Sequence, residues 1–234
     1  MSLEVRDITF SYDRVRMCKK ASETATPVLE SFGMEFPFGV ITALAGDNGV
    51  GKSTLARIIM GILKPAAGSI YVDGSCIDNH SVAERGRLIG YAMQNPSKQI
   101  FSKTVIEEVE YGLTNLNLED TGETAAGYLE MFGLSHKAEE FPFTLSHGEK
   151  QRLVLASILA MKPRYLILDE PTAGLDIRHK QVLGEILRDI AVPSEEKNCL
   201  GCGVIVISHD RKFVEEYCDN IKIMKKLPVE MHHE

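Results

Sequence analysis

Nine consecutive residues in the first quarter of the chain have the types and spacing of a phosphate-binding loop. The segment 46–54 reads GDNGVGKST, which fits the pattern G-x-x-x-x-G-K-[ST] between a strand-like run and a helical one. Its glycines let successive backbone N–H groups face anionic oxygens, and Lys52 and Ser53 are suited to phosphates and to Mg²⁺. We therefore expect a nucleoside triphosphate to contact the whole run: Gly46, Asp47, Asn48, Gly49, Val50, Gly51, Lys52, Ser53 and Thr54.

Polar residues also stand at the ends of three other apolar runs. YLILD ends at Asp169 and is followed by Glu170, LIGYAM is followed by Gln94, and VIVIS is followed by His209. Ligands of open parallel sheets bind outside the carboxyl ends of the strands, so these side chains should converge on the phosphate-binding loop. A single strand-end carboxylate or a single histidine is often structural, but four strand ends at one site favour hydrolysis of a triphosphate.

The residue types indicate how the roles are divided. Ser53, Gln94 and Asp169 offer oxygen ligands of the kind that Mg²⁺ prefers, with Asp169 acting through water. Glu170 is suited to be the base that positions the attacking water. His209 and Gln94 are expected to contact that water or the γ-phosphate, so the predicted catalytic set is Glu170, His209 and Gln94.

The elements that would position these residues follow from the apolar runs. Continuous apolar runs of this length are typical of strands buried on both faces of a parallel sheet. Helical segments separate them, which predicts an α/β core of the type found in P-loop NTPases. The runs are VITALA (40–45), LIGYAM (88–93), YLILD (165–169) and VIVIS (204–208).

The rest of the chain predicts two additions to this core. The early segments 2–10, 28–35 and 69–74 have the character of an antiparallel sheet, with a polar loop from Arg14 to Pro27 between the first two. Residues 95–161 are mostly helix-like and predict an inserted helical subdomain. We expect one domain over 1–234, in which 1–94 and 162–234 form the nucleotide-binding core.

Composition restricts where the protein acts and what it binds. The chain has 234 residues, 44% of them hydrophobic, and a net charge of −7. No apolar run reaches the roughly 18–20 residues that span a bilayer, and the first ten residues lack the layout of a signal peptide. We expect a cytoplasmic protein that reaches a membrane only through a partner. The net negative charge argues against a nucleic-acid partner.

Five cysteines lack the spacing of a disulfide framework. Cys199 and Cys202 form a C-x-x-C in the stretch NCLGCG, without a second pair or nearby histidines to complete a zinc site. A reduced loop pair is the favoured interpretation, because disulfides are rare in the cytosol. A redox or metal role is the alternative.

The segment LSHGEKQR, residues 145–152, identifies a family when it is placed beside the other motifs. It resembles the LSGGQ signature of ABC ATPases, and the remaining features occur in that family's order. They are an aromatic residue for adenine (Tyr12), the phosphate-binding loop, the Q-loop at Gln94, the signature, YLILDE, the D-loop at Asp176 and the switch histidine at His209. The resemblance covers nearly the whole chain.

The resemblance implies ATP as the nucleotide and a second ABC ATPase subunit, identical or related, as a partner. Two such domains would meet head to tail, with each ATP between the phosphate-binding loop of one and the signature of the other. Ser146, Gly148 and Asp176 would then contact ATP across the interface, with the helix that follows Ser146 pointing its N-terminus at the γ-phosphate. Hydrolysis would let the dimer open.

Two residues depart from the family's signature. His147 replaces the first glycine, and Glu149 replaces glutamine. Ser146 and Glu149 retain S-x-x-E, a capping box that stabilises a helix start. If position 147 needs a positive φ, a histidine there is mildly penalised and lowers the activity of the partner's site. The favoured alternative is that the change is neutral, because Ser146 and Gly148 remain.

The segment YAMQNPSKQIFSKTVIEEVEYGL, residues 91–113, resembles the ATPases of energy-coupling factor and cobalt-type importers. This implies a transmembrane transporter subunit that contacts the region of Asn95, Pro96 and Gln99. It also implies a vitamin or a transition-metal ion as cargo, selected by a separate membrane protein. Many members continue into a C-terminal dimerisation segment, whereas this sequence stops at Glu234, so we expect a nucleotide-dependent dimer.

Three alternatives stay open at this point. An ATPase of another ABC transporter class shares all the chemistry and differs mainly at 91–113. A DNA-repair or translation ABC ATPase is disfavoured, because the chain has neither sustained heptads between loop and signature nor a second phosphate-binding loop. A subunit that binds ATP without hydrolysing it is disfavoured because Lys52, Asp169, Glu170 and His209 are all present.

Overall fold

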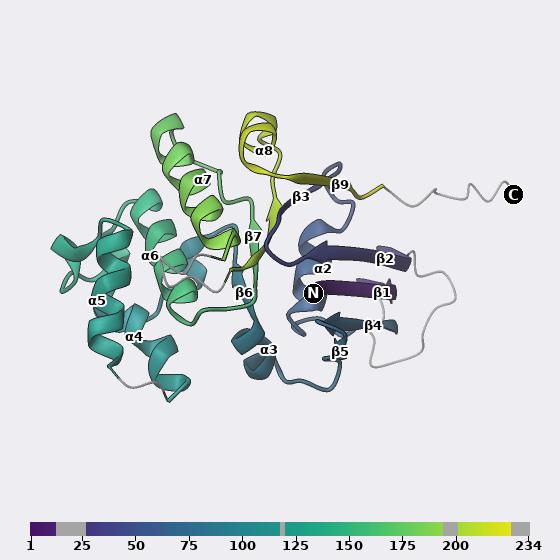
Figure 1. Ribbon diagram of the computed structural model, residues 1–234, viewed down its shortest axis with the longest axis horizontal. Coiled ribbons are helices and arrows are strands. Elements are labelled where there is room, and N and C mark those ends of the chain that lie inside the picture. Colours follow the sequence, from purple (N-terminus) through teal and green to yellow (C-terminus); the bar gives the residue numbers. More distant parts are fainter. Residues whose placement is uncertain (13–26, 118–119, 194–200, 226–234) are drawn as a thin grey trace, which may run out of the picture.

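The computed structural model describes residues 1–12, 27–117, 120–193 and 201–225. Two sheets and the helices packed around them make up this part of the chain (Figure 1). The antiparallel sheet lies at one end, the helices between residues 105 and 160 lie at the other, and the parallel sheet lies between them. Most of the predicted loop between Arg14 and Pro27 lies outside the described residues.

The parallel sheet confirms the predicted α/β class. Its order is β6-β7-β8-β3-β9, and every neighbouring pair is parallel. The strands are β6 (Ile89–Ala92), β7 (Tyr165–Asp169), β8 (Gly203–Ile207), β3 (Ile41–Ala45) and β9 (Asn220–Ile223). All residues of β6, β7 and β8 are buried, because helices or the second sheet cover both faces. This double burial explains the continuous apolar runs.

The antiparallel sheet has the order β2-β1-β4-β5 and covers one side of the core. Its strands are β1 (Ser2–Phe10), β2 (Leu29–Pro37), β4 (Ala67–Val72) and the two-residue β5 (Ser75–Cys76). Leu3, Val5, Ile8 and Phe10 of β1 are buried, in a cluster that also contains residues of the parallel sheet. Helix α2 (Lys52–Ile59) contributes to the same cluster, so this helix is held between the two sheets.

The helices on the other side share a second hydrophobic cluster. The long ones are α4 (Val105–Asn115), α5 (Thr121–Met131), α6 (His147–Ala160) and α7 (Ile177–Ala191), with α8 (Arg211–Tyr217) near the C-terminal strand. Three short 3₁₀ turns, η1 (Pro96–Lys98), η2 (Ser135–Lys137) and η3 (Pro142–Thr144), connect them. Val109, Leu129 and Leu153 pack there with Leu166 and Val204 of the parallel sheet. The predicted helical character of 95–161 agrees with these elements, and the exact subdomain limits stay a prediction.

Some boundaries differ from the sequence expectations. A seven-residue helix, α3 (Val82–Leu88), precedes β6, so the run LIGYAM contributes its leucine to a helix and only four residues to the strand. The helix begins because Ser81 and Glu84 form a capping box, a signal of two residues in a polar stretch. The strand predicted at 69–74 begins earlier and ends at Val72, where Asp73 and Gly74 turn with positive φ.

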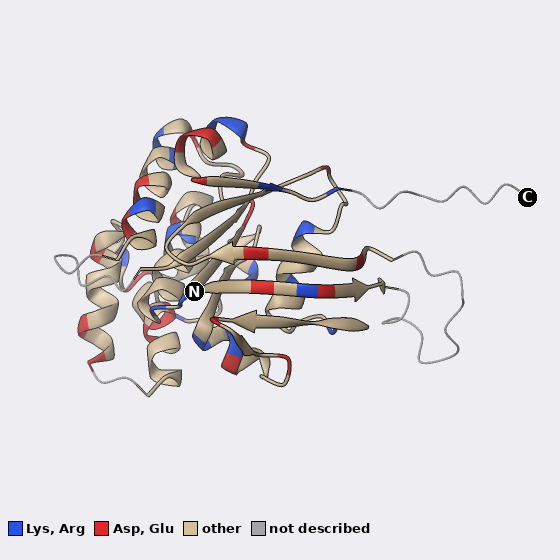
Figure 2. Cartoon of the chain, turned by 45° about the vertical axis from the view of Figure 1, so that its right-hand side comes forward, with Lys and Arg blue, Asp and Glu red and all other residues tan. Residues whose placement is uncertain are grey.

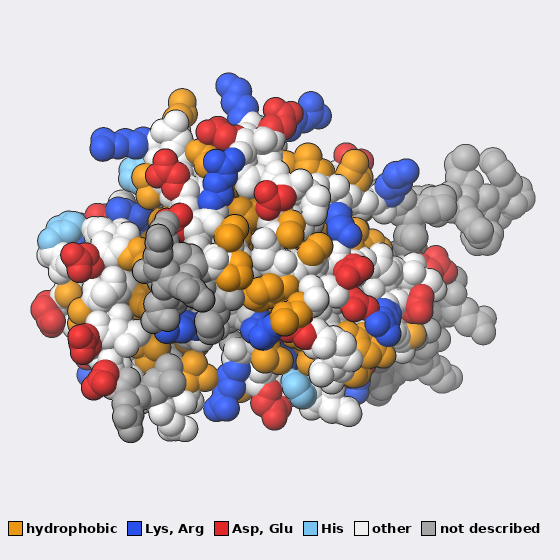
Figure 3. Space-filling model, in the orientation of Figure 1, with side chains coloured by type: hydrophobic (Ala, Val, Ile, Leu, Met, Phe, Trp, Pro, Cys, Tyr) orange, Lys and Arg blue, Asp and Glu red, His pale blue; other side chains and the backbone are white. Residues whose placement is uncertain are grey.

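Charged side chains of both signs are distributed over the surface. Figure 2 shows acidic and basic residues interspersed along the helices and along β1, where Glu4 pairs with Arg6 at 2.6 Å. In the space-filling view, hydrophobic side chains are most frequent near the centre of the face, among charged neighbours (Figure 3). No helix in the described part of the chain is long and apolar enough to cross a membrane.

Candidate functional site

The segment 46–51 forms a tight loop between β3 and α2, and two of its glycines have conformations that other residues avoid. Gly46 has φ 147°, and a Cβ there would lie 2.5 Å from the Met224 carbonyl oxygen. Gly51 has φ 107° and stands immediately before the first residue of α2. Only glycine accommodates both the dihedrals and the close approach at low cost. The loop therefore leads directly into the positive N-terminal end of α2.

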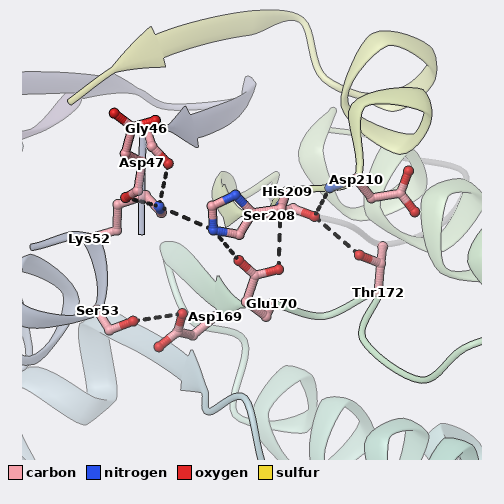
Figure 4. Close-up of polar contacts among 10 residues, drawn as sticks. All are labelled: Gly46, Asp47, Lys52, Ser53, Asp169, Glu170, Thr172, Ser208, His209 and Asp210. Atoms are coloured by element: carbon pink, nitrogen blue, oxygen red, sulfur yellow. Dashed lines mark hydrogen bonds and ion pairs between the residues drawn. The ribbon is translucent and has the colours of Figure 1, made fainter. Parts of the chain in front are cut away.

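Lys52 places its amine at the mouth of this loop. Its Nζ donates to the Gly46 carbonyl at 2.6 Å and to the Asp47 carbonyl at 3.0 Å, and it lies 3.4 Å from the His209 Nε2 (Figure 4). The side chain is only 7% exposed, so the charge is concentrated at one point of the site. A cation held between loop and strand ends is placed to attract phosphate oxygens.

Ser53 and Asp169 meet at the floor of the site. The Ser53 Oγ donates to the Asp169 Oδ1 at 3.0 Å, and the Tyr91 hydroxyl donates to the Asp169 Oδ2 at 3.2 Å. Burial and the Asp169 charge raise the pKa of Tyr91 to about 12, so the phenol stays a protonated donor. The Ser53 hydroxyl from α2 and the Asp169 carboxylate from β7 offer the oxygen ligands that Mg²⁺ prefers, and Gln94 lies in the same cleft.

Glu170 has an unusual backbone and a half-buried carboxylate. Its φ is 54°, in the left-handed region, and its N–H donates to the Ile207 carbonyl at 2.8 Å, which ties it to β8. Its Oε1 lies 3.4 Å from the His209 Nε2, and its Oε2 accepts from the His209 N–H at 3.4 Å. Burial raises the pKa of Glu170, and His209 and Lys52 offset part of that rise. A carboxylate with a raised pKa is the better proton acceptor.

These residues share one cleft of about 550 Å³. Because β6, β7, β8 and β3 are parallel neighbours, their carboxyl ends bring Gln94, Asp169, Glu170, His209 and the loop to the same edge. Tyr12 lines the cleft too, with its hydroxyl 3.0 Å from the Thr54 Oγ1. The full lining is Tyr12, Val28, Asn48, Gly49, Gly51, Lys52, Ser53, Thr54, Gln94, Asp169, Glu170, Ile207 and His209.

Three predicted ATP contacts lie elsewhere in the chain. Ser146 is the N-cap of α6, and Asp176 is the N-cap of α7, where its Oδ1 accepts from the His179 N–H at 2.9 Å. Gly148 lies beside the Leu175 side chain, which directly precedes Asp176. Ser146, Gly148 and Asp176 are absent from the lining of the cleft. Their contact with ATP stays a prediction that requires a second chain.

The signature helix begins with the predicted capping box. The Ser146 Oγ accepts from the Glu149 N–H at 3.4 Å, and the Glu149 Oε2 accepts from the Ser146 N–H at 2.8 Å. These contacts and Lys137, 3.0 Å away, lower the pKa of Glu149 to about 2. His147 is the first residue of the helix and does not have a positive φ, so its backbone carries no penalty. Its ring packs instead beside Gly174.

Sequence reasoning missed the contribution of two residues. Tyr91 is buried in β6 and reaches Asp169 across the sheet, and Gln99 binds the backbone of the same strand end. The available signal was a phenol inside a run of apolar residues, three positions before Gln94. Cys202 is buried, whereas Cys199 lies outside the described residues, so the role of the C-x-x-C stays untested.

Comparison with known proteins gives relatives over nearly the whole chain. The profile of the family described as ABC transporter matches residues 29–173. A Pyrococcus furiosus protein provisionally described as an ABC transporter ATP-binding protein is 37% identical over 98% of this chain and 82% of its own length. The energy-coupling factor transporter ATP-binding protein EcfA of Methanothermobacter thermautotrophicus is 36% identical over 95% of this chain and 67% of its own length. In contrast, the chain spans only 36% and 32% of the similar proteins of Methanosarcina mazei and Methanosarcina acetivorans.

Solved structures with the same fold include a component of an ABC transporter complex. The structure of cbiO1 from Clostridium perfringens, part of the ABC transporter complex cbiONQ, matches with a TM-score of 0.79 and 32% identity, over 97% of this chain and 86% of that one. The family profile covers more than half of the chain and agrees with the ordered motifs. The chain therefore belongs to the ABC transporter family of ATP-binding proteins, whose ATP-binding domains are ATPases.

Proposed function

We propose that this chain is the ATP-hydrolysing subunit of an importer of the energy-coupling factor type. The observation that carries the hydrolytic part is the meeting of Lys52, the neighbours Asp169 and Glu170, and His209 at one cleft, from three separate segments of the chain. In this arrangement Lys52 and the loop N–H groups hold the triphosphate of ATP, with Tyr12 at the adenine. Glu170 accepts a proton from the attacking water, and His209 and Gln94 orient that water and the γ-phosphate.

Mg²⁺, held by Ser53, Asp169 and Gln94, would neutralise charge on the phosphates as the bond to the γ-phosphate breaks. The fit of this donor set is supported by the close approach of the Ser53 hydroxyl and the Asp169 carboxylate. The two side chains come from α2 and β7, so binding of the ion ties the phosphate loop to the centre of the sheet. All three ligands supply oxygen, as Mg²⁺ prefers.

A second ABC ATPase subunit would complete each site. Ser146, Gly148 and Asp176 lie outside the cleft of their own chain, and they cluster at the N-terminal ends of α6 and α7. A head-to-tail pair would bring this surface against the γ-phosphate bound by the partner, so that ATP closes the dimer and hydrolysis releases it. A solved ABC transporter cassette with a TM-score of 0.79 and 25% identity to this chain is described as dimeric.

The importer part of the proposal is supported by the segment 91–113 and by the relatives. Residues of this segment line a groove of about 570 Å³ between α3, α4 and α6, with Phe101 and Tyr111 59% and 53% exposed. Their rings meet edge to face at 4.6 Å, which presents an aromatic surface beside Gln99. We place the transmembrane transporter subunit in this groove. Through that partner the chain would reside on the cytoplasmic face of the membrane.

The cargo would be a vitamin or a transition-metal ion, chosen by a separate membrane protein. Both the cbiONQ component and the energy-coupling factor ATPases among the relatives agree with this class of importer. The test is to tag the chain in its own host and to identify the membrane proteins that purify with it. Recovery of an exporter or of a different importer class would replace the energy-coupling factor part and leave the ATPase part standing.

The hydrolytic part is tested with Glu170→Gln. This variant keeps the shape of the side chain but removes the base, so we expect retained ATP binding, loss of phosphate release by at least about a hundredfold, and accumulation of a dimer with ATP. Phosphate release and sedimentation of the purified chain measure these effects. Glu139→Gln, an exposed carboxylate outside the cleft, serves as the control. Unchanged phosphate release in Glu170→Gln would remove Glu170 as the base.

A further inference from the structure

The carboxylate of Asp169 is held at both oxygens by hydroxyl groups. Its Oδ1 accepts from Ser53 at 3.0 Å and its Oδ2 from Tyr91 at 3.2 Å (Figure 4 shows the Ser53 contact). Asp169 is 5% exposed and Tyr91 is 6% exposed, so neither contact is shared freely with bulk water. With one donor on each oxygen, the carboxylate is held in one orientation about its terminal C–C bond. Without such donors, the distribution of this torsion angle is broad.

The chemistry of the Tyr91 donor suits a cation site. A lysine or arginine in this place would neutralise the carboxylate and compete with Mg²⁺ for it. A neutral hydroxyl restrains the orientation of Asp169 while leaving its full negative charge for the cation. The phenol also fills the space beneath Asp169 with an apolar ring, which packs in the hydrophobic cluster between the sheets. The Tyr91 hydroxyl can thus orient Asp169 without adding a positive charge of its own beside the carboxylate.

The strand that carries Tyr91 is itself held at its open edge by one side chain. Among the described strands, β6 is the outermost on its side of the parallel sheet and pairs only with β7. Gln99 donates from its Nε2 to the Tyr91 carbonyl at 2.7 Å and accepts at its Oε1 from the Met93 N–H at 2.6 Å. One carbonyl and the N–H two residues later are the pair that a neighbouring parallel strand would bind. The Gln99 side-chain amide therefore makes the two hydrogen bonds that a further parallel strand would make with Tyr91 and Met93.

Gln99 also belongs to the groove in which we place the transmembrane partner. The groove is lined by Gln99, Phe101 and Glu108 among others. The buried Glu108 carboxylate accepts from the Phe101 N–H at 3.0 Å and from the Ser102 N–H at 2.8 Å, which fastens the loop after Gln99 to α4. A partner that contacts this loop therefore acts on the side chain that holds the end of β6.

We propose that Tyr91 is a positioning residue for Asp169 and that Gln99 holds Tyr91 in place, so that the groove and the Mg²⁺ site share one hydrogen-bonded strand end. The proposal rests on the proposed function, because it concerns residues that orient Asp169, a proposed Mg²⁺ ligand of the ATPase. It predicts that Mg²⁺-dependent nucleotide binding depends on a hydroxyl that touches neither the nucleotide nor the ion. It also predicts that Gln99 acts through Tyr91.

The test compares Tyr91→Phe with Tyr165→Phe. Tyr165 is a matched control, because it is a fully buried tyrosine on the adjacent strand whose hydroxyl donates to the Asp73 carboxylate at 3.0 Å, away from the cleft. Affinity for a fluorescent ATP analogue is titrated with Mg²⁺ and with EDTA. For Tyr91→Phe we expect the Mg²⁺-dependent gain in affinity to fall by about tenfold, the loss of one hydrogen bond to a charged group, with binding in EDTA unchanged. For Tyr165→Phe we expect both values to equal those of the wild type.

A second variant tests the role of Gln99. Gln99→Met preserves the length of the side chain and removes both hydrogen bonds to β6. We expect a smaller loss of the Mg²⁺-dependent gain, about threefold, and no further loss when Gln99→Met is added to Tyr91→Phe, because both act through one carboxylate. Additive losses would show that Gln99 acts by another route and would overturn that half of the proposal.

The outcomes separate this proposal from the ATPase assignment. If the wild type binds the analogue with a Mg²⁺-dependent gain and Tyr91→Phe matches Tyr165→Phe, then Tyr91 does not position Asp169 and the inference is wrong. If the wild type shows no nucleotide binding at all, the proposed function itself fails. Thermal unfolding of the two tyrosine variants is measured in parallel. A drop in Mg²⁺-dependent binding that appears equally in both variants reports a general loss of stability, and it too overturns the inference.

Discussion

The Lys52 amine contacts three neighbouring groups, and a bound triphosphate would either replace these contacts or add to them. Its Nζ is 2.6 Å and 3.0 Å from two carbonyl oxygens of its own loop and 3.4 Å from the His209 ring. The loop backbone therefore prepositions the charge, and little side-chain freedom is left to lose when a phosphate arrives. At this scale the site is a set of fixed donors, with Glu170 as the acceptor opposite them.

Replacement of Lys52 by alanine should remove most nucleotide affinity. Loss of a charge-assisted contact to phosphate costs about 2–3 kcal/mol, or roughly 30- to 150-fold in Kd. The matched control is Lys180→Ala, which removes a lysine that pairs with Asp210 at 2.6 Å outside the cleft. Calorimetric titration with ATP measures both variants. Equal affinities in the two would contradict the assignment of Lys52 to the phosphates.

At the scale of the element, the first turn of α6 is held by contacts that sequence and fold supply together. The capping box of Ser146 and Glu149 is local, but Lys137, which pairs with the Glu149 Oε1 at 3.0 Å, comes from η2. A negative charge in the first turn of a helix also interacts favourably with its dipole. The first turn of the signature helix is therefore held on two sides, and neither Ser146 nor Gly148 lines the chain's own cleft.

Glu149→Gln should destabilise the chain by about 1 kcal/mol at pH 7, since it removes the charge that faces Lys137 and the helix dipole. The folded-state pKa of Glu149 is about 2, below its ordinary value of 4.5. A lowered carboxylate pKa gives stability that is complete above pH 4.5 and disappears as pH falls toward 2. The difference between variant and wild type should therefore shrink through that window.

Urea denaturation at pH 7, 5 and 3.5 measures this difference in the free energy of unfolding. Glu139→Gln is the control, because Glu139 is an exposed carboxylate in the same stretch of chain. We expect it to change stability by less than about 0.5 kcal/mol. A Glu149→Gln penalty that stays constant from pH 7 to pH 3.5 would show that the ionised carboxylate is not what stabilises α6.

At the scale of the whole molecule, the ATP cleft and the groove are linked by the segment that connects β6 to α4. Gln94, just after β6, lines the cleft. Gln99 and Phe101 of the connecting segment line the groove, together with Tyr111 of α4. The helices α4 and α6, which line the groove, pack on the sheet through the second hydrophobic cluster, the one that contains Val109, Leu153 and Leu166. A partner seated in the groove would therefore contact helices that pack on the same sheet whose strand ends line the cleft.

Phe101→Ser should weaken binding of the membrane partner and leave ATP binding intact. An exposed aromatic ring at the centre of an interface contributes about 2 kcal/mol, or roughly 30-fold in affinity. The control is Met131→Ser, which removes an apolar side chain of similar exposure at the end of α5. Recovery of the membrane partner on the tagged chain measures the effect. Equal recovery with both variants would place the partner on another surface.

The sequence by itself determined the parallel core, the phosphate loop and the strand ends that meet at the cleft. Strands buried on both faces leave continuous apolar runs, and a loop that must turn at glycines leaves a fixed spacing. These signals are local, so they can be recognised one segment at a time. The short helix α3 escaped recognition because its capping box lies in a polar stretch of few residues.

Only the tertiary structure decided which distant side chains meet. The Tyr91 hydroxyl reaches Asp169 from 78 positions away, and the Gln99 amide serves as a strand partner because β6 happens to be an edge. The same holds for the signature, where the His147 ring lies beside Gly174 and no signature residue lines the chain's own cleft. Contacts between elements depend on strand order and on how helices pack, and a one-dimensional spacing contains neither. The phosphate loop was therefore readable in the sequence, while the support beneath Asp169 was not.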